Sequence, residues 1–253
     1  DLTRPTPAAD LLPLIIAEIR QAGLDERTIT ILLAGGTHPP ASAEEMAKKV
    51  GADLPPAIRV MAHDSRGDLV DVGTSPAGLP VRINRTVMEC DLKIGVGCIY
   101  PHPIAGFSGG AKIVLPALCG VETTRMMHDY LRGSRERGGS IHTELRRDMI
   151  AVARKVGLDF IANVTLNHRR EISGLFAGDL VKAHEEGVKV AQRIYAVPVV
   201  PAADIVVARF TVVEGVHIHQ DQALFGIGDG AVVVDRVECL FLVDLAHLCG
   251  IAL

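Results

Sequence analysis

Residues 101–116 gather side chains that could do chemistry: His102, Ser108 and Lys112 lie among three glycines. The apolar residues 92–100 come directly before them and predict a buried strand. Glycines allow a ligand to approach the backbone closely, and consecutive N–H groups can face an anion. The segment therefore predicts a ligand site where a strand ends.

The segment does not match the phosphate loop of nucleotide hydrolases, which needs Gly-Lys-Ser/Thr in succession. Here Ala111 separates Gly110 from Lys112, and Ile113 follows. A tight strand-to-helix turn with a surface lysine is the alternative interpretation of these residues.

A second candidate is His38, in the turn Gly35-Gly36-Thr37-His38 that follows the predicted buried strand 28–34. A helix is expected to begin at Ser42, and ligands gather at the carboxyl ends of strands in such βα units. His63 follows a short strand, and His128 lies on a predicted helix over 122–131. We expect ordinary surface or core roles for the remaining histidines: His142, His168, His184, His217, His219 and His247. His217 and His219 are two apart, so they could also form a metal pair on one strand face.

Composition narrows the function classes. The chain has 253 residues, a net charge of −4 and no Trp, which gives no sign of nucleic-acid binding. No uninterrupted apolar run reaches the length of a membrane span, so no membrane partner is expected. The five cysteines include no CxxC pair, which predicts reduced thiols in a cytoplasmic protein and disfavours a cysteine zinc site. Because the chain starts at Asp1 without Met and ends just after an apolar run, we expect a fragment or a processed chain.

Alternating strands and helices predict an α/β fold, with an open, mostly parallel sheet and helices on both faces. We expect a cofactor-binding, catalytic domain over 1–197 and a smaller, partial α/β domain over 198–253. Residues 70–73 and 81–84 should form a hairpin, and residues 133–140 an exposed loop. Further helices are expected over 8–22, 144–156 and 181–195, and further strands over 58–61 and 159–167.

Several segments together resemble the nickel-dependent lactate racemase family, over about residues 1–195. They are Asp1-Leu-Thr-Arg-Pro, Gly36-Thr-His-Pro, the whole of residues 101–112, His128, the strand 160–167 and Phe176-Ala-Gly-Asp. The resemblance implies a two-domain α/β isomerase that racemises or epimerises a small 2-hydroxy acid. Its cofactor would be a nickel pincer nucleotide, a pyridinium mononucleotide with a thiocarboxylate and a thioamide link to lysine. Cofactor-synthesis enzymes would be transient partners.

The resemblance also implies residue roles. Lys112 would carry the cofactor, and His128 would be the protein ligand of nickel. His38 and His102 would be the acid/base pair. Asp1 and Arg4 would lie near the nucleotide and the substrate anion, and the N–H groups around Ser108, Gly109 and Gly110 could face the cofactor phosphate.

This chemistry suits the substrate. The Cα–H of a 2-hydroxy carboxylate is poorly acidic, because the carboxylate resists a second negative charge. Removal of the hydrogen as a hydride, while a base takes the hydroxyl proton, gives a flat 2-keto acid that can be reduced from either face. Two histidines that titrate near neutrality would serve the two hydroxyl orientations.

The sequence departs from the family in two places. Pro39 replaces an arginine of Gly-Thr-His-Arg-Pro. After Asp221-Gln222, the positions of the family's Tyr-Gln and Lys carry Phe225, Gly226 and Asp229, and an aspartate would repel a carboxylate. A cofactor-free binding protein for small organic acids is therefore the alternative. A zinc hydrolase using His38, His63 or His102 ranks lower, because no HExxH-type pair accompanies them.

Overall fold

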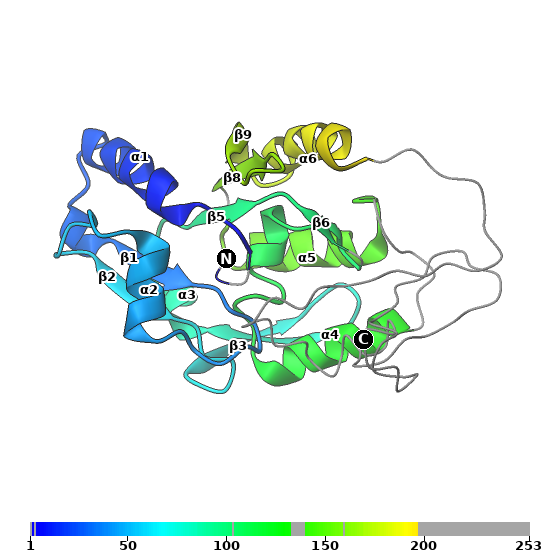
Figure 1. The fold of residues 1–253 in the computed structure, drawn as a ribbon. Coiled ribbons are helices and arrows are strands. Elements are labelled where there is room, and N and C mark those ends of the chain that lie inside the picture. Colours follow the sequence, from blue (N-terminus) through cyan, green and yellow to red (C-terminus); the bar gives the residue numbers. More distant parts are fainter. Residues whose placement is uncertain (1, 3, 103, 133–139, 159, 197–253) are drawn as a thin grey trace, which may run out of the picture. The chain divides into compact units, whose positions relative to one another are not determined.

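The computed structural model describes residues 2, 4–102, 104–132, 140–158 and 160–196. All of these belong to the first of the two units, Asp1–Ala196 and Val197–Leu253, into which the chain divides. Strands and helices alternate along this unit (Figure 1), which confirms the predicted α/β class. The helical segments are α1 (Ala8–Gln21), η1 (Glu26–Thr28), α2 (Ala43–Val50), α3 (Arg85–Glu89), η2 (Gly110–Ile113), α4 (Val121–Arg132), α5 (Glu144–Lys155) and α6 (Lys182–Tyr195). The strands are β1 (Thr30–Leu33), β2 (Arg59–Ala62), β3 (Leu69–Thr74), β4 (Pro80–Asn84), β5 (Ile94–Cys98), β6 (Pro101–His102), β7 (Gly106–Phe107), β8 (Phe160–Leu166) and β9 (Ile172–Asp179).

The sheets are open, and the described strands pair in four groups. The pairs β1–β2 and β5–β8 are parallel, as βα connections require. The predicted hairpin β3–β4 is present and antiparallel, and β6–β7 is a second, very short hairpin. β9 pairs antiparallel with β8 as an edge strand that the sequence analysis did not predict.

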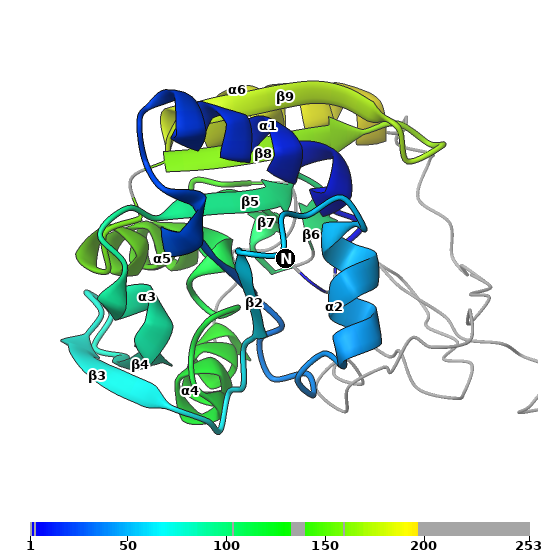
Figure 2. The ribbon, with the colours of Figure 1, turned by 90° about the vertical axis from the view of Figure 1, so that its left-hand side faces the viewer.

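Helices cover both faces of the sheet β5–β8–β9, as predicted. Figure 2 shows α1 in front of this sheet and α6 behind it. On the first face, Leu11 of α1 packs with Cys98, Val164 and Leu166. On the other face, Val188 and Ala191 of α6 pack with Ile99 and Phe107, which come directly before and within the glycine-rich loop. The sheet therefore presents that loop to α6.

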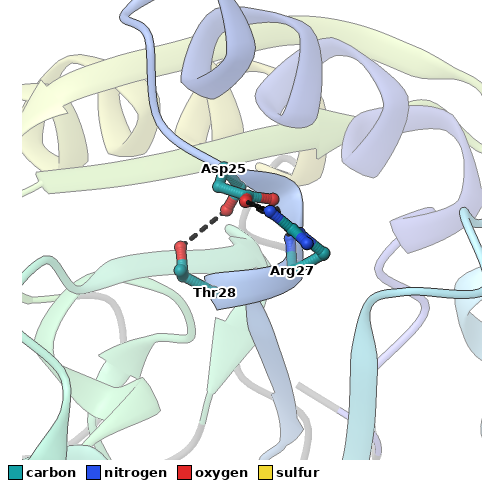
Figure 3. Close-up of polar contacts among 3 residues, drawn as sticks. All are labelled: Asp25, Arg27 and Thr28. Atoms are coloured by element: carbon teal, nitrogen blue, oxygen red, sulfur yellow. Dashed lines mark hydrogen bonds and ion pairs between the residues drawn. The ribbon is translucent and has the colours of Figure 1, made fainter.

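A short turn carries the chain from α1 into β1. Gly23, with φ of 80°, follows the end of α1. Asp25 then caps η1: its side chain accepts the Arg27 N–H at 2.9 Å, and its carbonyl accepts the Thr28 hydroxyl at 2.6 Å (Figure 3). The turn brings β1 alongside β2, so the His38 segment follows directly from a paired strand.

The predicted beginning of α2 is confirmed by its hydrogen bonds. The Ser42 hydroxyl accepts the Glu45 N–H at 3.2 Å, and the Glu45 carboxylate accepts the Ser42 N–H at 2.8 Å. This reciprocal pair is a capping box. It ends the His38 segment and fixes where the helix begins.

The largest apolar cluster lies beneath the glycine-rich loop. Leu115 and Val114, just after η2, pack there with Met149 and Val152 of α5 and Ile161 of β8. These side chains are at most 2% exposed. The end of the loop is thus anchored in a close-packed core.

Several predictions lie outside the described residues. They are Asp1, the loop over 133–139, the metal pair His217 and His219, the altered positions Phe225, Gly226 and Asp229, and the domain over 198–253. Among the described residues, Cys90, Cys98 and Cys119 are free thiols. No helix in the described ranges is long and apolar enough to cross a membrane.

Candidate active site

The glycine-rich loop leaves β5 at Cys98 and folds onto itself. In the hairpin β6–β7, Pro101 lies opposite Phe107 and His102 opposite Gly106. Ser108 closes the base of this hairpin, because its hydroxyl donates to the Cys98 carbonyl at 2.7 Å and accepts the Tyr100 N–H at 2.9 Å. The Ser108 hydroxyl is therefore used to shape the loop.

Two backbone N–H groups of the loop are also engaged within the protein. The Ser108 N–H donates to the Tyr100 carbonyl at 2.8 Å, and the Gly110 N–H donates to Asn163 Oδ1 at 2.7 Å. Of the three N–H groups expected near a phosphate, the one without a partner among the described residues belongs to Gly109. That N–H remains the candidate anion donor at this turn.

Three buried side chains from three different elements hold the loop. Asn163 of β8 accepts the Gly110 N–H and donates to the Gly95 carbonyl at 3.3 Å. His184 of α6 donates from Nε2 to the Ser108 carbonyl at 2.9 Å, and burial lowers its pKa to about 3. Arg146 of α5 donates to the carbonyls of Ala105, Phe107 and Gly109. The loop is thereby fixed before any ligand arrives.

His102 has a defined proton position. Its Nδ1 accepts the Ile104 N–H at 3.2 Å and the Ala105 N–H at 3.1 Å. A neutral imidazole that accepts at Nδ1 carries its proton on Nε2. Burial, followed by the positive charges of Lys112, Arg4, Arg146 and His128, holds the pKa of His102 well below its usual value. The ring is therefore neutral and presents an N–H at its outer edge.

Lys112 lies in η2, half-buried, with its backbone N–H donating to the Gly109 carbonyl at 3.3 Å. Burial, followed by the neighbouring charges of Arg4 and Arg146, lowers the pKa of its ammonium to about 7. A large share of Lys112 is consequently an uncharged amine near neutral pH. Such an amine is a nucleophile.

Arg4 joins this cluster from the N-terminal segment. That segment lies beside the end of β1, because the Leu2 N–H donates to the Ala34 carbonyl at 2.9 Å. Lys49 of α2 holds it from the other side, with Nζ 2.8 Å from the Arg4 carbonyl oxygen. The Arg4 Nε is buried and has no hydrogen-bond partner among the described residues. A buried, unpaired guanidinium N–H is a site for an anion.

Arg4, Lys112 and His128 all lie near enough to His102 for their positive charges to lower its pKa. His128 lies half-buried on α4. His38 is half-buried in the other strand-end segment, which is tied to the chain after η2 by the Gly36 N–H, 2.9 Å from the Ala117 carbonyl oxygen.

His63 is a core residue. It is 1% exposed, its Nε2 donates to the Cys119 carbonyl at 3.0 Å, and its Nδ1 accepts from Asn84 at 3.2 Å. With both nitrogens engaged, the ring has no lone pair for zinc. Nowhere among the described residues do three His, Cys, Asp or Glu side chains gather as a metal site. The zinc hydrolase hypothesis therefore has no support in this part of the chain.

Sequence reasoning did not single out Arg146, and it expected an ordinary role for His184. Arg146 could have been noticed from helical spacing: it lies three before Met149 and seven before Ala153, on the buried face of α5. An arginine on an apolar helix face requires buried partners.

Comparisons with known proteins identify the family. A family model for the lactate racemase N-terminal domain matches residues 1–139. The lactate racemase of Lactiplantibacillus plantarum is 36% identical over 205 residues, which are 79% of this chain and 48% of that protein. The lactate racemase of Thermoanaerobacterium thermosaccharolyticum is 33% identical over 249 residues, covering 94% of this chain and 58% of that one. The chain thus spans about half the length of the curated relatives it matches.

Solved structures give the same result for the fold. The lactate racemase apoprotein from Thermoanaerobacterium thermosaccharolyticum has a TM-score of 0.74 at 36% identity, covering 80% of this chain and 49% of that one. A protein from Thermotoga maritima has a TM-score of 0.63 at 23% identity, covering 77% of this chain and 53% of that one, and shows the fold alone.

Proposed function

Because the chain belongs to the lactate racemase family, we propose that it interconverts the enantiomers of a small 2-hydroxy acid, with lactate as the first candidate. The single observation that carries the proposal is the cluster of one cation, Arg4, with two basic groups, His102 and Lys112, which come from three separate parts of the chain. The substrate is an anion, and the cluster combines an anion-binding cation with a titratable ring and an amine.

Two features of the cluster fit a nickel pincer nucleotide, whose attachment and ligation the family resemblance assigns to Lys112 and His128. The first is the lowered pKa of Lys112, which favours the uncharged amine that a thioamide link requires. The second is the unpaired, buried Nε of Arg4, which suits a phosphate or a carboxylate. When bound, this group would supply an acceptor for the hydrogen on Cα as a hydride.

The protein's own residues would then bind and orient the substrate. Arg4 would hold the carboxylate or the nucleotide phosphate. His102, neutral with its proton on Nε2, would donate a hydrogen bond to the substrate oxygen on its side. For His102 to take a proton instead, its Nδ1 would have to give up the N–H groups of Ile104 and Ala105. His38 would act from the opposite loop as the second acid/base group.

The test is an assay of D- and L-lactate after co-production of the chain with the cofactor-synthesis enzymes. We expect D-lactate to give L-lactate, and the reverse, with full loss in Lys112→Ala. Lys48→Ala changes an exposed lysine on α2 and should leave the rate unchanged. Interconversion that survives Lys112→Ala would contradict the role given to Lys112, and no interconversion by the unchanged chain would overturn the proposal. Lactate binding without interconversion would support the cofactor-free binding protein instead.

A further inference from the structure

Arg146 is a buried cation whose partners in the described part of the chain are all uncharged. It is 2% exposed, and no described carboxylate forms an ion pair with it. Its neighbour Arg147 differs, because its guanidinium is exposed and lies 3.8 Å from Glu144. Burying a charge is costly unless hydrogen bonds compensate, so the partners that Arg146 does have define its role.

Those partners are three alternate carbonyls of one loop. Nη2 donates to Ala105 at 2.8 Å and also to Phe107, and Nη1 donates to Gly109 at 3.3 Å. The backbone turns here, with φ of 72° at Gly106 and 76° at Gly109, and these turns let one planar guanidinium bind all three carbonyls. Arg146 therefore fixes the direction of the backbone over five residues.

The last of these carbonyls connects Arg146 with Lys112. The Gly109 carbonyl accepts both the Arg146 Nη1–H and the backbone N–H of Lys112, the latter at 3.3 Å. This shared acceptor sets where η2 begins and so where the lysine side chain leaves the backbone. The Arg146 charge also acts directly on Lys112, together with that of Arg4.

We propose that Arg146 is a positioning residue, which shapes the loop from Ala105 to Gly109 and holds Lys112 ready as a reactive amine. The groups facing Lys112 that matter for its protonation are Arg4 from the N-terminal segment, Arg146 from α5 and His102 from β6. The inference rests on the proposed function only for the identity of the group that Lys112 receives. The claims about the shape of the loop and the reactivity of the Lys112 amine apply to the protein without any cofactor.

The experiment measures amine reactivity in the cofactor-free chain. Fluorodinitrobenzene is applied over a range of pH, and arylation of Lys112 is followed by peptide mass spectrometry against exposed Lys48. We expect the midpoint for Lys112 near pH 7 in the unchanged chain. In Arg146→Met it should rise by about one pH unit, which lowers the reactive fraction at pH 7 about fivefold. Arg147→Met should leave the midpoint where it was.

Arg146→Lys separates shape from charge, because it keeps a buried cation and loses the planar fork. Amide hydrogen exchange should accelerate at Ser108, Gly110 and Lys112 in this variant and in Arg146→Met, while α1 remains protected. If Arg146→Met does not fold, Arg146→Lys alone carries the test. Unchanged exchange in Arg146→Lys, or an unchanged Lys112 midpoint in Arg146→Met, would overturn the inference. Neither readout depends on lactate turnover, so a failure of the proposed function would be seen separately.

Discussion

The two strand-end segments that carry the predicted catalytic histidines are built differently. The loop after β5 is held by the buried side chains of Asn163, His184 and Arg146, from three elements. The segment after β1 is tied mainly by backbone bonds, such as the Gly36 N–H to the Ala117 carbonyl. The loop bearing Lys112 and His102 is therefore shaped by buried side chains from outside it, whereas a backbone bond to Ala117 ties the segment bearing His38.

Two glycines with nearly the same backbone conformation provide the sharpest comparison. Gly36 has φ of 59° and Gly110 has φ of 56°, so an alanine costs about 1 kcal/mol of left-handed strain at either. A Cβ at Gly110 would also lie 2.8 Å from His184 Cδ2, whereas at Gly36 it would meet only the Ala117 Cα at 4.0 Å. We expect Gly110→Ala to lower the free energy of unfolding by about 3 kcal/mol more than Gly36→Ala. Equal losses of unfolding free energy in urea denaturation would contradict the claim that the loop after β5 is more tightly packed than the segment after β1.

Asn163 tests the side-chain support directly. Asn163→Ala leaves the Gly110 N–H and the Gly95 carbonyl without their partner, so we expect the free energy of unfolding to fall by about 3 kcal/mol. Asn167→Ala, just after the same strand, is the control, because its side-chain bonds to Arg169 and Glu171 are exposed and their loss should cost only about 1 kcal/mol. Urea denaturation compares them. A loss in Asn163→Ala no larger than in the control would argue against this bond as a support.

His184 gives the loop a dependence on pH. Its pKa is about 3 in the folded chain and 6.5 ordinarily, so as the pH falls below 6.5 the unfolded chain binds a proton that the folded chain does not. The stability from neutral His184 is therefore present above pH 6.5 and is lost progressively down to about pH 3. Between pH 7 and pH 5 this amounts to about 2 kcal/mol.

That share of the pH dependence should be absent in His184→Gln. The change in free energy of unfolding between pH 7 and pH 5 is measured in the unchanged chain, in His184→Gln and in a control variant, His168→Gln. His168→Gln alters an exposed histidine and should retain the full dependence. A dependence in His184→Gln as steep as in the unchanged chain would mean that another group is responsible.

The sequence predicted those elements whose signals are local. Ser42 and Glu45 mark the beginning of α2, and the spacing of Leu11, Leu12 and Ile16 marks the buried face of α1. The sequence analysis did not predict β9, because Gly174 and Gly178 weaken the strand propensity of this segment. It forms through pairing with β8, a contact that no single segment encodes.

The candidate site was predictable in part for the same reason. His102 and Lys112 stand out because they lie beside glycines in one short segment. Arg146 and His184 act on that segment from 37 and 76 residues away in the chain, measured to Gly109 and Ser108. Only the folded chain brings them together, and it also fixes the proton of His102 on Nε2 through two backbone N–H groups.

The central claim is that the loop after β5 is a preformed attachment site for a cofactor at Lys112. The most direct measurement is the mass of the chain and of its Lys112 peptide, with nickel content, after co-production with the cofactor-synthesis enzymes. We predict a mass excess that maps to Lys112 and about one nickel per chain. An unmodified Lys112 and no nickel after co-production would contradict the claim.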